Sequence, residues 1–358
     1  MENVTKKPNT PVVIWLGAVS FLIMIMVVLG GATRLSGAGL SMVDWSLIGN
    51  LPPLSQSAWL EVFEAYKKFP EYQLINYDMT VEQFKEIFWW EYLHRMLGRL
   101  IGMCFALPWF YFMIRKTIKF KSKLNLKLLL AFALGATQGF IGWYMVKSGL
   151  VKIPHVSHLR LTTHLCTAFI LVSYLVWIAM TELWPAKQKG FNKSIPTWLV
   201  NSSVILPALL LFQIAYGGLN AGLKAGYVFT DFPKMFGYLI PPHMFGTPTF
   251  LRSLVFDITT VHFIHRTFAW VLFFGILGLW YFGKKALNAL HIASAGDLNH
   301  YRHHQTALNY LAIAVSGQFI LGILTVLTHT QMHTALAHQV WGCVLLLCSV
   351  NLIQQFRR

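Results

Sequence analysis

Residues 11–30 read PVVIWLGAVSFLIMIMVVLG, a run of twenty residues without a charged side chain. An α-helix rises about 1.5 Å per residue, so this run is long enough to cross the roughly 30 Å hydrocarbon core of a membrane. Seven further apolar runs of similar length follow along the chain. They cover residues 88–114, 125–146, 159–180, 196–219, 259–283, 306–328 and 333–354. The sequence therefore predicts an all-α integral membrane protein with eight transmembrane helices.

The composition also argues against a soluble protein. Of 358 residues, 56% are hydrophobic and 12% are charged, whereas about 25% of the residues in a soluble domain are charged. The 29 Lys and Arg residues against 13 Asp and Glu residues would suggest nucleic-acid binding if the basic residues clustered on a soluble surface. They lie instead in short stretches between the apolar runs. The excess charge therefore reports on membrane topology, and no nucleic-acid partner is expected.

The loop from Arg115 to Lys127 carries six basic residues and no acidic one. The positive-inside rule assigns such a loop to the cytoplasm, and alternation of the spans then places both termini in the cytoplasm. The N-terminal tail contains Lys6 and Lys7, and no small-residue cleavage site precedes Gly30-Gly31, so we expect the first span to be retained. Because the tail does not resemble an Arg-rich transit peptide, we expect a bacterial inner membrane and not an organelle.

The two halves of the chain share a series of landmarks in the same order. The matched landmarks, with the first-half member given first, are Gly30-Gly31 and Gly217-Gly218, Asp44-Trp45 and Asp231-Phe232, Pro52-Pro53 and Pro241-Pro242, His94-Arg95 and His265-Arg266, Gln138 and Gln318, Gly142 and Gly322, and His164 and His338. Four spans lie in each half, so the two copies have the same membrane orientation. We expect two pseudo-symmetric parallel four-helix bundles, formed by residues 1–190 and 191–358.

Four of the histidines recur across this repeat, and ionisable residues inside a membrane are usually functional. They are His94, His164, His265 and His338. Each lies about five residues into an even-numbered apolar run, roughly 8 Å below the outer end of its helix. Each half then presents two imidazoles from two helices at one depth, which suits bis-histidine ligation of haem iron. A structural zinc site would need four ligands with cysteine or carboxylate support, which do not cluster here.

One acidic residue breaks the symmetry of the repeat. Glu91 precedes His94 by three residues, so the two share a helix face, whereas the matching position in the second half is His262. Two interpretations remain open. Glu91 either pairs with Arg95 or Arg99, or its carboxylate does chemistry beside one macrocycle while the other site holds a permanent haem. A di-iron site would require a repeated Glu-x-x-His, which is found only once.

Several long motifs resemble those of the haem A synthase family. The matching runs are GGATRLSGAGLSM at 30–42, FKEIFWWEYLHRMLGR at 84–99, GWYMVKSGL at 142–150 and RLTTHL at 160–165. The resemblance extends over nearly the whole chain. Residues 31–87 contain no cysteine, so the chain resembles the branch that lacks a cysteine pair in the first outer loop, shared by alphaproteobacteria and mitochondria.

The resemblance implies an oxidoreductase that converts the C8 methyl of haem O to the formyl group of haem A for terminal oxidases. It implies that His94 and His164 flank the substrate haem, that His265 and His338 ligate haem b, and that Glu91 is the catalytic carboxylate. The implied partners are haem O synthase, a membrane or quinone-side electron donor and terminal oxidase assembly factors. A homo-oligomer is left open.

Four arginines near the predicted outer face are candidate partners of the anionic haem propionates, because a guanidinium binds a carboxylate through two hydrogen bonds. They are Arg34, Arg95, Arg160 and Arg266. For each of them, a role as a plain interfacial anchor or a contact with a backbone carbonyl is an equally good interpretation.

Three other classes of protein would explain part of these features. A dihaem electron-transfer protein would use all four histidines, but it would usually place its haems near opposite membrane faces. A transporter with parallel repeats would explain the duplication, but it would need binding groups near the bilayer midplane. A structural haem-binding subunit would not need Glu91.

Overall fold

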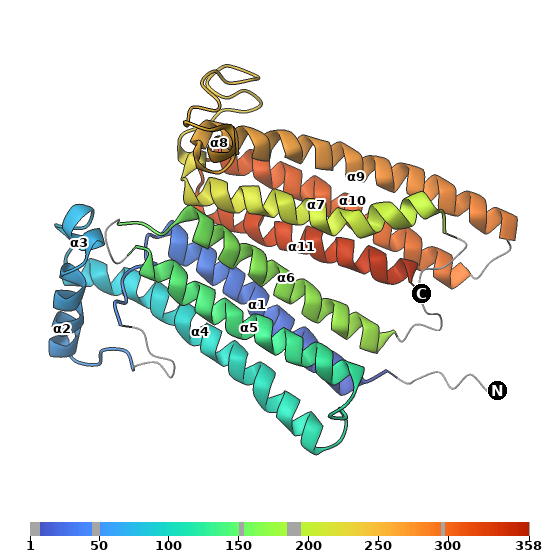
Figure 1. Ribbon diagram of the computed structural model, residues 1–358, viewed down its shortest axis with the longest axis horizontal. Helices are drawn as coiled ribbons and strands as arrows, with labels where there is room; N and C mark the ends of the chain where they lie inside the picture. Colours follow the sequence, from blue (N-terminus) through green and yellow to red (C-terminus); the bar gives the residue numbers. More distant parts are fainter. Residues whose placement is uncertain (1–7, 45–50, 150–153, 185–194, 295–297, 358) are drawn as a thin grey trace. The chain divides into compact units, whose positions relative to one another are not determined.

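The computed structural model describes residues 8–44, 51–149, 154–184, 195–294 and 298–357 (Figure 1). Every regular element in these ranges is a helix, and eight helices are long and apolar enough to cross a membrane. These are α1 (Thr10–Leu35), α4 (Val81–Ile114), α5 (Lys123–Lys147), α6 (His158–Leu183), α7 (Thr197–Gly222), α9 (Ile258–Ser294), α10 (Leu298–Leu327) and α11 (Met332–Phe356). The predicted all-α membrane fold with eight spans is confirmed.

The chain divides into two compact units, residues 19–171 and residues 1–18 with 172–358. Within the second unit, α7 packs on α9, α9 on α10, α10 on α11 and α11 on α7, so these helices close into a four-helix bundle. Within the first unit, α4 packs on α5. The expected division into halves at residue 190, and the pseudo-symmetry of two bundles, stay predictions.

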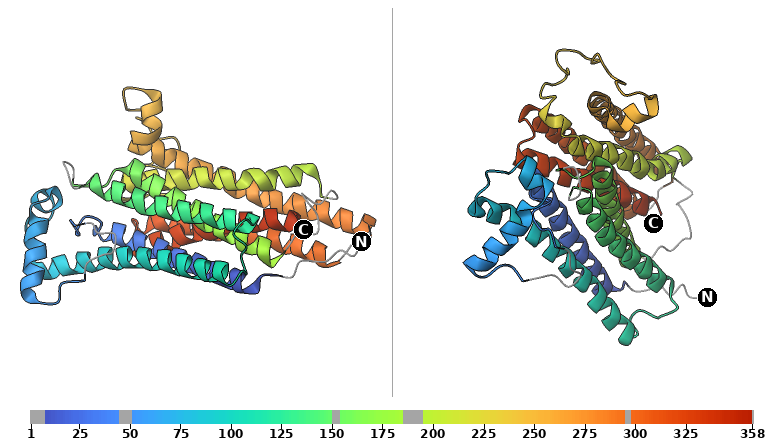
Figure 2. Two further views of the ribbon diagram at one scale, coloured as in Figure 1. Left: turned by 60° about the horizontal axis from the view of Figure 1, so that its bottom comes forward. Right: turned by 60° about the vertical axis from the view of Figure 1, so that its left-hand side comes forward.

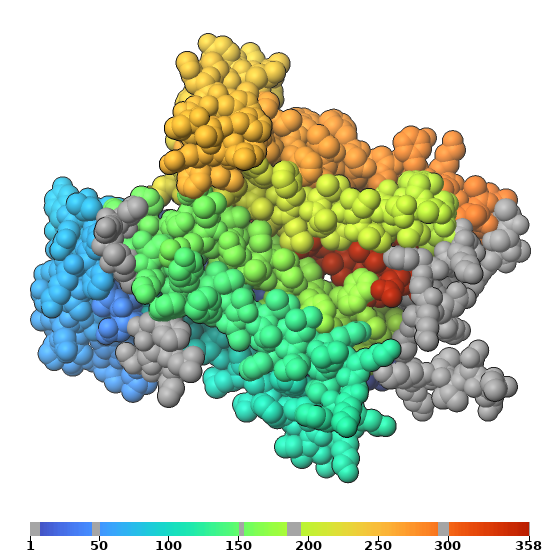
Figure 3. Space-filling view, viewed as in Figure 1, coloured from blue at the N-terminus to red at the C-terminus, as the bar shows by residue number. Residues whose placement is uncertain are grey.

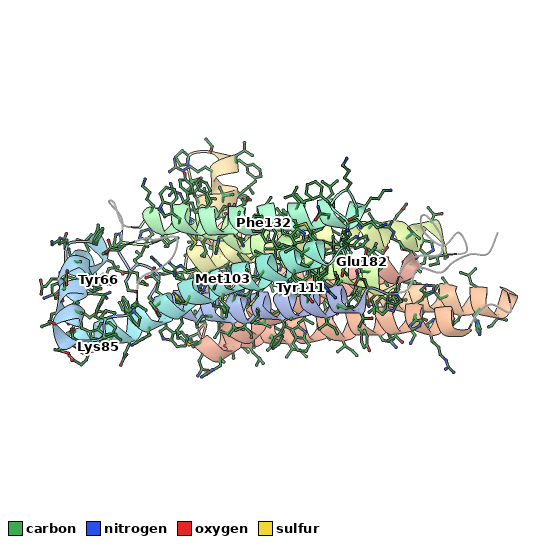
Figure 4. The ribbon with its side chains drawn as sticks, turned by 90° about the horizontal axis from the view of Figure 1, so that it is seen from below. Tyr66, Lys85, Met103, Tyr111, Phe132 and Glu182 are labelled. Carbon is green, nitrogen blue, oxygen red and sulfur yellow. The ribbon has the colours of Figure 1, made fainter. Side chains whose placement is uncertain are left out.

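Apolar side chains on α4 and α5 are exposed, as expected of helices that face lipid. Met103 and Tyr111 are 52% and 57% exposed on α4, and Phe132 is 42% exposed on α5. Figure 4 labels these three side chains, with Met103 and Tyr111 following Lys85 along the same helix. An apolar surface of this kind would be an aggregation hazard in water and is stable in a bilayer.

Helix α4 begins at Val81, seven residues before the predicted span at 88. The Thr80 hydroxyl accepts from the Gln83 amide, and the Gln83 side chain accepts from the Thr80 amide, which together form a capping box. The early start places His94 thirteen residues into its helix, whereas the other three histidines lie six or seven residues from their helix starts. Distance from the helix end therefore does not measure the depth of His94.

Residues 51–80, in the loop between α1 and α4, fold onto this extension of α4, which the sequence did not predict. Helix α2 (Gln56–Lys67) and the short α3 (Pro70–Leu74) lie beside the N-terminal end of α4 (Figures 1 and 2). Their contact is an aromatic cluster of buried side chains, Trp59, Phe63, Tyr66, Phe84 and Phe88. Aromatic pairs of this kind add about 0.5–1.5 kcal/mol each beyond the area they bury, so the loop is held as a folded cap.

The loop between α7 and α9 also contains helical turns. These are η1 (Ala225–Tyr227) and α8 (Phe250–Phe256). In Figure 3 the segment that runs from η1 to the end of α8 forms a protruding lobe, coloured yellow to gold. Ala225, Phe229 and Met235 form its buried core, so this loop also has a small hydrophobic core of its own.

Candidate functional site

The four predicted histidines all occupy the same local setting. In each case the imidazole edge that carries Cε1 and Nδ1 lies against a glycine of a neighbouring helix. The histidine and glycine pairs are His94 with Gly30, His164 with Gly142, His265 with Gly217, and His338 with Gly322. The repeat that was predicted from sequence landmarks is therefore present in side-chain contacts as well.

All four imidazoles have a buried ring nitrogen without a partner. The Nδ1 atoms of all four are buried, and within the described part of the chain they have no hydrogen-bond partner. The four residues as a whole are half-buried. At His338, Nε2 lies 3.4 Å from Nε2 of Gln318. Imidazoles of this kind are candidate ligands of a metal ion.

His265 and His338 have a spacing that fits a single metal ion between them. Their ring centroids are 6.5 Å apart, and the ring planes are inclined at 86°. Two metal–nitrogen bonds of about 2 Å, plus about 1 Å within each ring, give about 6 Å between ring centres. The residues present therefore fit a haem with one histidine on each side of the iron.

His94 on α4 and His164 on α6 both lie in the other unit. The backbone carbonyl of His164 accepts a hydrogen bond from the Gln138 side chain at 2.9 Å, and that of His265 accepts one from Gln213 at 2.9 Å. In the described residues, no group of three or more His, Cys, Asp or Glu side chains could hold a metal ion. The histidine pairs are therefore the groups on which a metal interpretation rests.

Glu91 is 3% exposed and accepts several hydrogen bonds. The Ser41 hydroxyl donates to it at 2.8 Å and the Met42 amide at 2.9 Å. Arg95 donates from Nε at 3.1 Å and from Nη2 at 2.6 Å. The predicted pairing with Arg95 is confirmed. Together, Glu91 and Arg95 connect α4 to residues 41–44 of the loop that follows α1. The catalytic role of Glu91 stays a prediction, because its position one turn before His94 is compatible with an ion pair alone and with chemistry beside a haem.

The position of Glu91 is taken in the second half by a buried imidazole. His262 is 1% exposed, its Nδ1 lies 2.9 Å from Asn220 Oδ1, and its Nε2 lies 3.4 Å from Arg266. It stacks on Phe229 with ring centroids 5.0 Å apart. Glu91 contacts Arg95 and His262 contacts Arg266, in each case four residues further along the helix. Only the first half has a carboxylate at this position. Sequence reasoning did not identify Ser41 or Asn220 as partners, because both contacts join different helices or loops.

Three of the four candidate propionate arginines donate to backbone carbonyls. Arg95 donates to the carbonyls of Met42 and Asp44, at 2.8 Å and 2.7 Å. Arg266 donates to those of Asp231 and Lys234, at 2.8 Å and 3.1 Å. The acceptors at Asp44 and Asp231 are matched landmarks of the repeat, so both halves use the same contact.

Arg160 donates to the Tyr144 carbonyl at 2.6 Å and covers the Tyr144 ring. Arg34 lies in the last turn of α1. The carbonyl interpretation therefore holds for three of the arginines, and contacts with propionates stay a prediction for all four.

Asp231 itself is stabilised as a carboxylate in the loop between α7 and α9. Partial burial opposes its charge, but the amides of Phe236 and Gly237 each donate to it at 3.1 Å. These hydrogen bonds and the nearby Arg266 lower the pKa of Asp231 below its ordinary value. The loop turn at 231–237 is therefore held by a charged acceptor at neutral pH.

A family model described as "Cytochrome oxidase assembly protein", COX15-CtaA, matches residues 13–350. The chain belongs to the COX15-CtaA family. Proteins named "Heme A synthase" are similar to it over most of both lengths. That of Nitrosospira multiformis is 40% identical over 349 residues, 97% of this chain and 94% of the relative. That of Nitrosomonas eutropha is 41% identical over 339 residues, 94% and 91% of the two chains.

The COX15-CtaA relative from Flavobacterium johnsoniae, also named "Heme A synthase", is 39% identical over 346 residues, 95% of this chain and 96% of the relative. The family resemblance that the sequence motifs indicated is therefore confirmed. The proposed branch without the cysteine pair stays a prediction. In this COX15-CtaA chain the four cysteines are free thiols on α4, α6 and α11.

Proposed function

We propose that this chain is a haem A synthase, a membrane oxidoreductase that oxidises the C8 methyl of haem O to the formyl group of haem A. The observation that carries the proposal is identity of about 40% with proteins of that name over almost the full chain. The eight membrane spans suit a substrate as apolar as haem O. The family description, cytochrome oxidase assembly, supports a use of the product in terminal oxidases.

We infer that His265 and His338 hold haem b and that His94 and His164 flank the substrate haem. The 6.5 Å ring spacing in the C-terminal pair and the common glycine contact at all four histidines support this division. Haem b, when bound, supplies one-electron redox chemistry. The protein's own contribution is to hold the imidazoles of His265 and His338 in the closed four-helix bundle of α7, α9, α10 and α11.

Glu91 is the residue we assign to the chemistry at the methyl carbon. Oxidation of a methyl group to an aldehyde takes two successive two-electron steps, through an alcohol and then a gem-diol that loses water. Protons leave the substrate at each step, and a positioned carboxylate can accept a proton from water or stabilise positive charge at the carbon. Ser41, Met42 and Arg95 fix the Glu91 carboxylate in one orientation, one helical turn from His94.

We propose a bacterial inner membrane with both termini in the cytoplasm. The six basic residues between Arg115 and Lys127 support this topology. It places the loop helices α2 and α8 and the N-terminal ends of α6 and α11 on the outer side. Haem O synthase would supply the substrate. A redox partner in the membrane or at the quinone side would accept the four electrons that are released if water supplies the oxygen, or donate electrons if O₂ supplies it.

Pigment analysis of the purified protein tests the proposal. The chain is expressed with and without haem O synthase, and the extracted haems are separated by chromatography and identified by mass. We expect haem B in both preparations and haem O with haem A only in the first. A colourless protein would support the transporter, whereas haem B without any conversion of haem O would support a dihaem electron-transfer protein.

A further inference from the structure

The contact between each histidine and its glycine is tighter than ordinary packing. A Cβ atom placed on the glycine would lie 2.9 Å from His94 Cε1 at Gly30 and 3.2 Å from His164 Cε1 at Gly142. The corresponding distances to Cε1 are 3.2 Å at Gly217 and 3.1 Å at Gly322. Ordinary carbon contacts lie at about 3.5–4.0 Å, so any side chain at these four positions would push the imidazole away.

We propose that Gly30, Gly142, Gly217 and Gly322 are positioning residues that set the orientation of the four histidines. Each glycine receives the Cε1 corner of a ring, with Nδ1 the nearer and Nε2 the more distant of the two ring nitrogens. The inference rests on the proposed function, because it assigns these glycines to haem ligation. We name each glycine with its histidine a ring seat.

The identity of the atoms in contact supports this role. In every ring seat the nearest ring atom is Cε1, followed by Nδ1, and Nε2 is the most distant of the three at 3.8–4.0 Å. The same edge therefore faces the glycine on α1, α5, α7 and α10. Glycines that only allowed close helix packing would meet varied atoms, whereas these four meet one edge of one residue type.

Three of the ring seats contain a second shared residue. A glutamine precedes the glycine by four residues, one helical turn away, at Gln138, Gln213 and Gln318. Gln138 and Gln213 donate to the backbone carbonyl of the seated histidine at 2.9 Å. These two glutamines hold the backbone of the histidine, while the glycine contacts its ring. Gln318 differs, because its Nε2 lies 3.4 Å from Nε2 of the His338 ring. The Gly30 ring seat has Met26 at this position.

Alanine substitution would displace the imidazole by several tenths of an ångström. Metal–nitrogen distances vary by only about 0.2 Å between well-formed sites, so a ring displaced further cannot keep the same bond. Changing a residue that orients a metal ligand typically lowers metal affinity on the order of 10- to 100-fold. We expect a loss of haem of that size from the affected pair and not from the other.

Helix α5 offers a matched control. A Cβ at Gly139 would meet no other described atom within 4 Å, apart from its own helix backbone, although Gly139 lies only three residues before Gly142. Gly275 on α9 is open in the same way and serves as a control for Gly217. The four variants Gly142→Ala, Gly139→Ala, Gly217→Ala and Gly275→Ala therefore separate the ring contact from a general effect of alanine.

The experiment uses the full chain purified after expression with haem O synthase. The readouts are the amount of each extracted haem and the low-spin electron paramagnetic resonance signal of iron with two histidine ligands. Gly217→Ala should lose low-spin haem B while Gly275→Ala keeps it, and Gly142→Ala should lose haem O and A while Gly139→Ala keeps them. In each variant, the haem bound by the unchanged histidine pair should be retained, which shows that the variant is folded.

Melting temperatures of apoprotein variants test the contact without haem. Gly142→Ala should lower the melting temperature of the otherwise unchanged chain but not that of the His164→Ala variant, because the imidazole that the methyl group meets is then absent. Equal losses in both backgrounds, or unchanged low-spin haem in Gly142→Ala and Gly217→Ala, would overturn the inference. A haem-free wild-type protein would instead overturn the proposed function.

Discussion

Replacement of Glu91 separates its structural role from its proposed chemical role. Glu91→Ala removes the acceptor for the Ser41 hydroxyl, the Met42 amide and the Arg95 guanidinium. Removing one partner of a buried ion pair costs about 3–5 kcal/mol. Arg95 retains 12% side-chain exposure and its two carbonyl acceptors. We therefore expect Glu91→Ala to cost about 3 kcal/mol, at the low end of that range.

Glu91→Gln should cost less, because the amide oxygen can still accept from Ser41 and Met42. It loses both hydrogen bonds with Arg95, because Ser41 and Met42 contact Oε2 and the NH₂ group of the amide then replaces Oε1. The hydrogen bonds that it keeps with Ser41 and Met42 should make it about 1–2 kcal/mol more stable than Glu91→Ala. Thermal unfolding in detergent should therefore rank the wild type above Glu91→Gln and Glu91→Gln above Glu91→Ala. Glu82→Gln is the control, since Glu82 forms only an exposed pair with Lys85 on the same helix and should lie within about 0.5 kcal/mol of the wild type.

Conversion of haem O should not follow that ranking. If the carboxylate acts at the methyl carbon, Glu91→Gln and Glu91→Ala both abolish formation of haem A while both retain haem B. Expression with haem O synthase and extraction of the haems measure this directly. Near-normal haem A in Glu91→Gln, with a lowered melting temperature, would show that Glu91 only anchors the first outer loop and would refute the assignment.

Three further outcomes are expected. Alanine at His265 or His338 should remove most haem B, whereas alanine at either N-terminal-half histidine should mainly abolish conversion of haem O; equal loss of haem B from both pairs would contradict one haem per half. Burial and a neighbouring carboxylate raise the pKa of Tyr66, so the unfolded chain releases the phenol proton first and the melting temperature should fall above about pH 10. Tyr66→Phe should remove that fall, and an unchanged slope would exclude Tyr66 as its source. A cysteine at Ser57 should react with an impermeant thiol reagent on intact cells while one at Lys121 stays protected; the reverse pattern would invert the topology.

The spans were predictable because each is an apolar run long enough to be helical without tertiary contacts. The loop helix α2 was not, since a helix of twelve residues depends on packing, here of Trp59 and Phe63 against Phe84 and Phe88. The same packing explains why α4 starts at Val81 and not at residue 88. Short helices in the outer loops are therefore the part of the fold that hydropathy does not report.

The candidate site divides in a similar way. The histidines were identified because they recur at matched positions, and the structure gives all four the same surroundings. The glycine opposite each ring could not be assigned from one sequence, because the contact joins two helices. A signal was present nonetheless, since Gln138, Gln213 and Gln318 each precede one of these glycines by four residues. For Glu91 the sequence left two interpretations, and the structure shows the pairing with Arg95.

The arginine contacts with the outer loops have a consequence for how this sequence can change. Arg95 and Arg266 bind the carbonyl oxygens of Asp44 and Asp231, and a backbone carbonyl is present whatever side chain a residue carries. Substitutions at Asp44 therefore leave its carbonyl contact in place, whereas the carboxylate of Asp231 also holds its own loop turn. Loss of either arginine removes several contacts at once. The two loops are free to diverge in sequence, and each half can acquire a different outer surface without losing the attachment of that surface to the membrane helices.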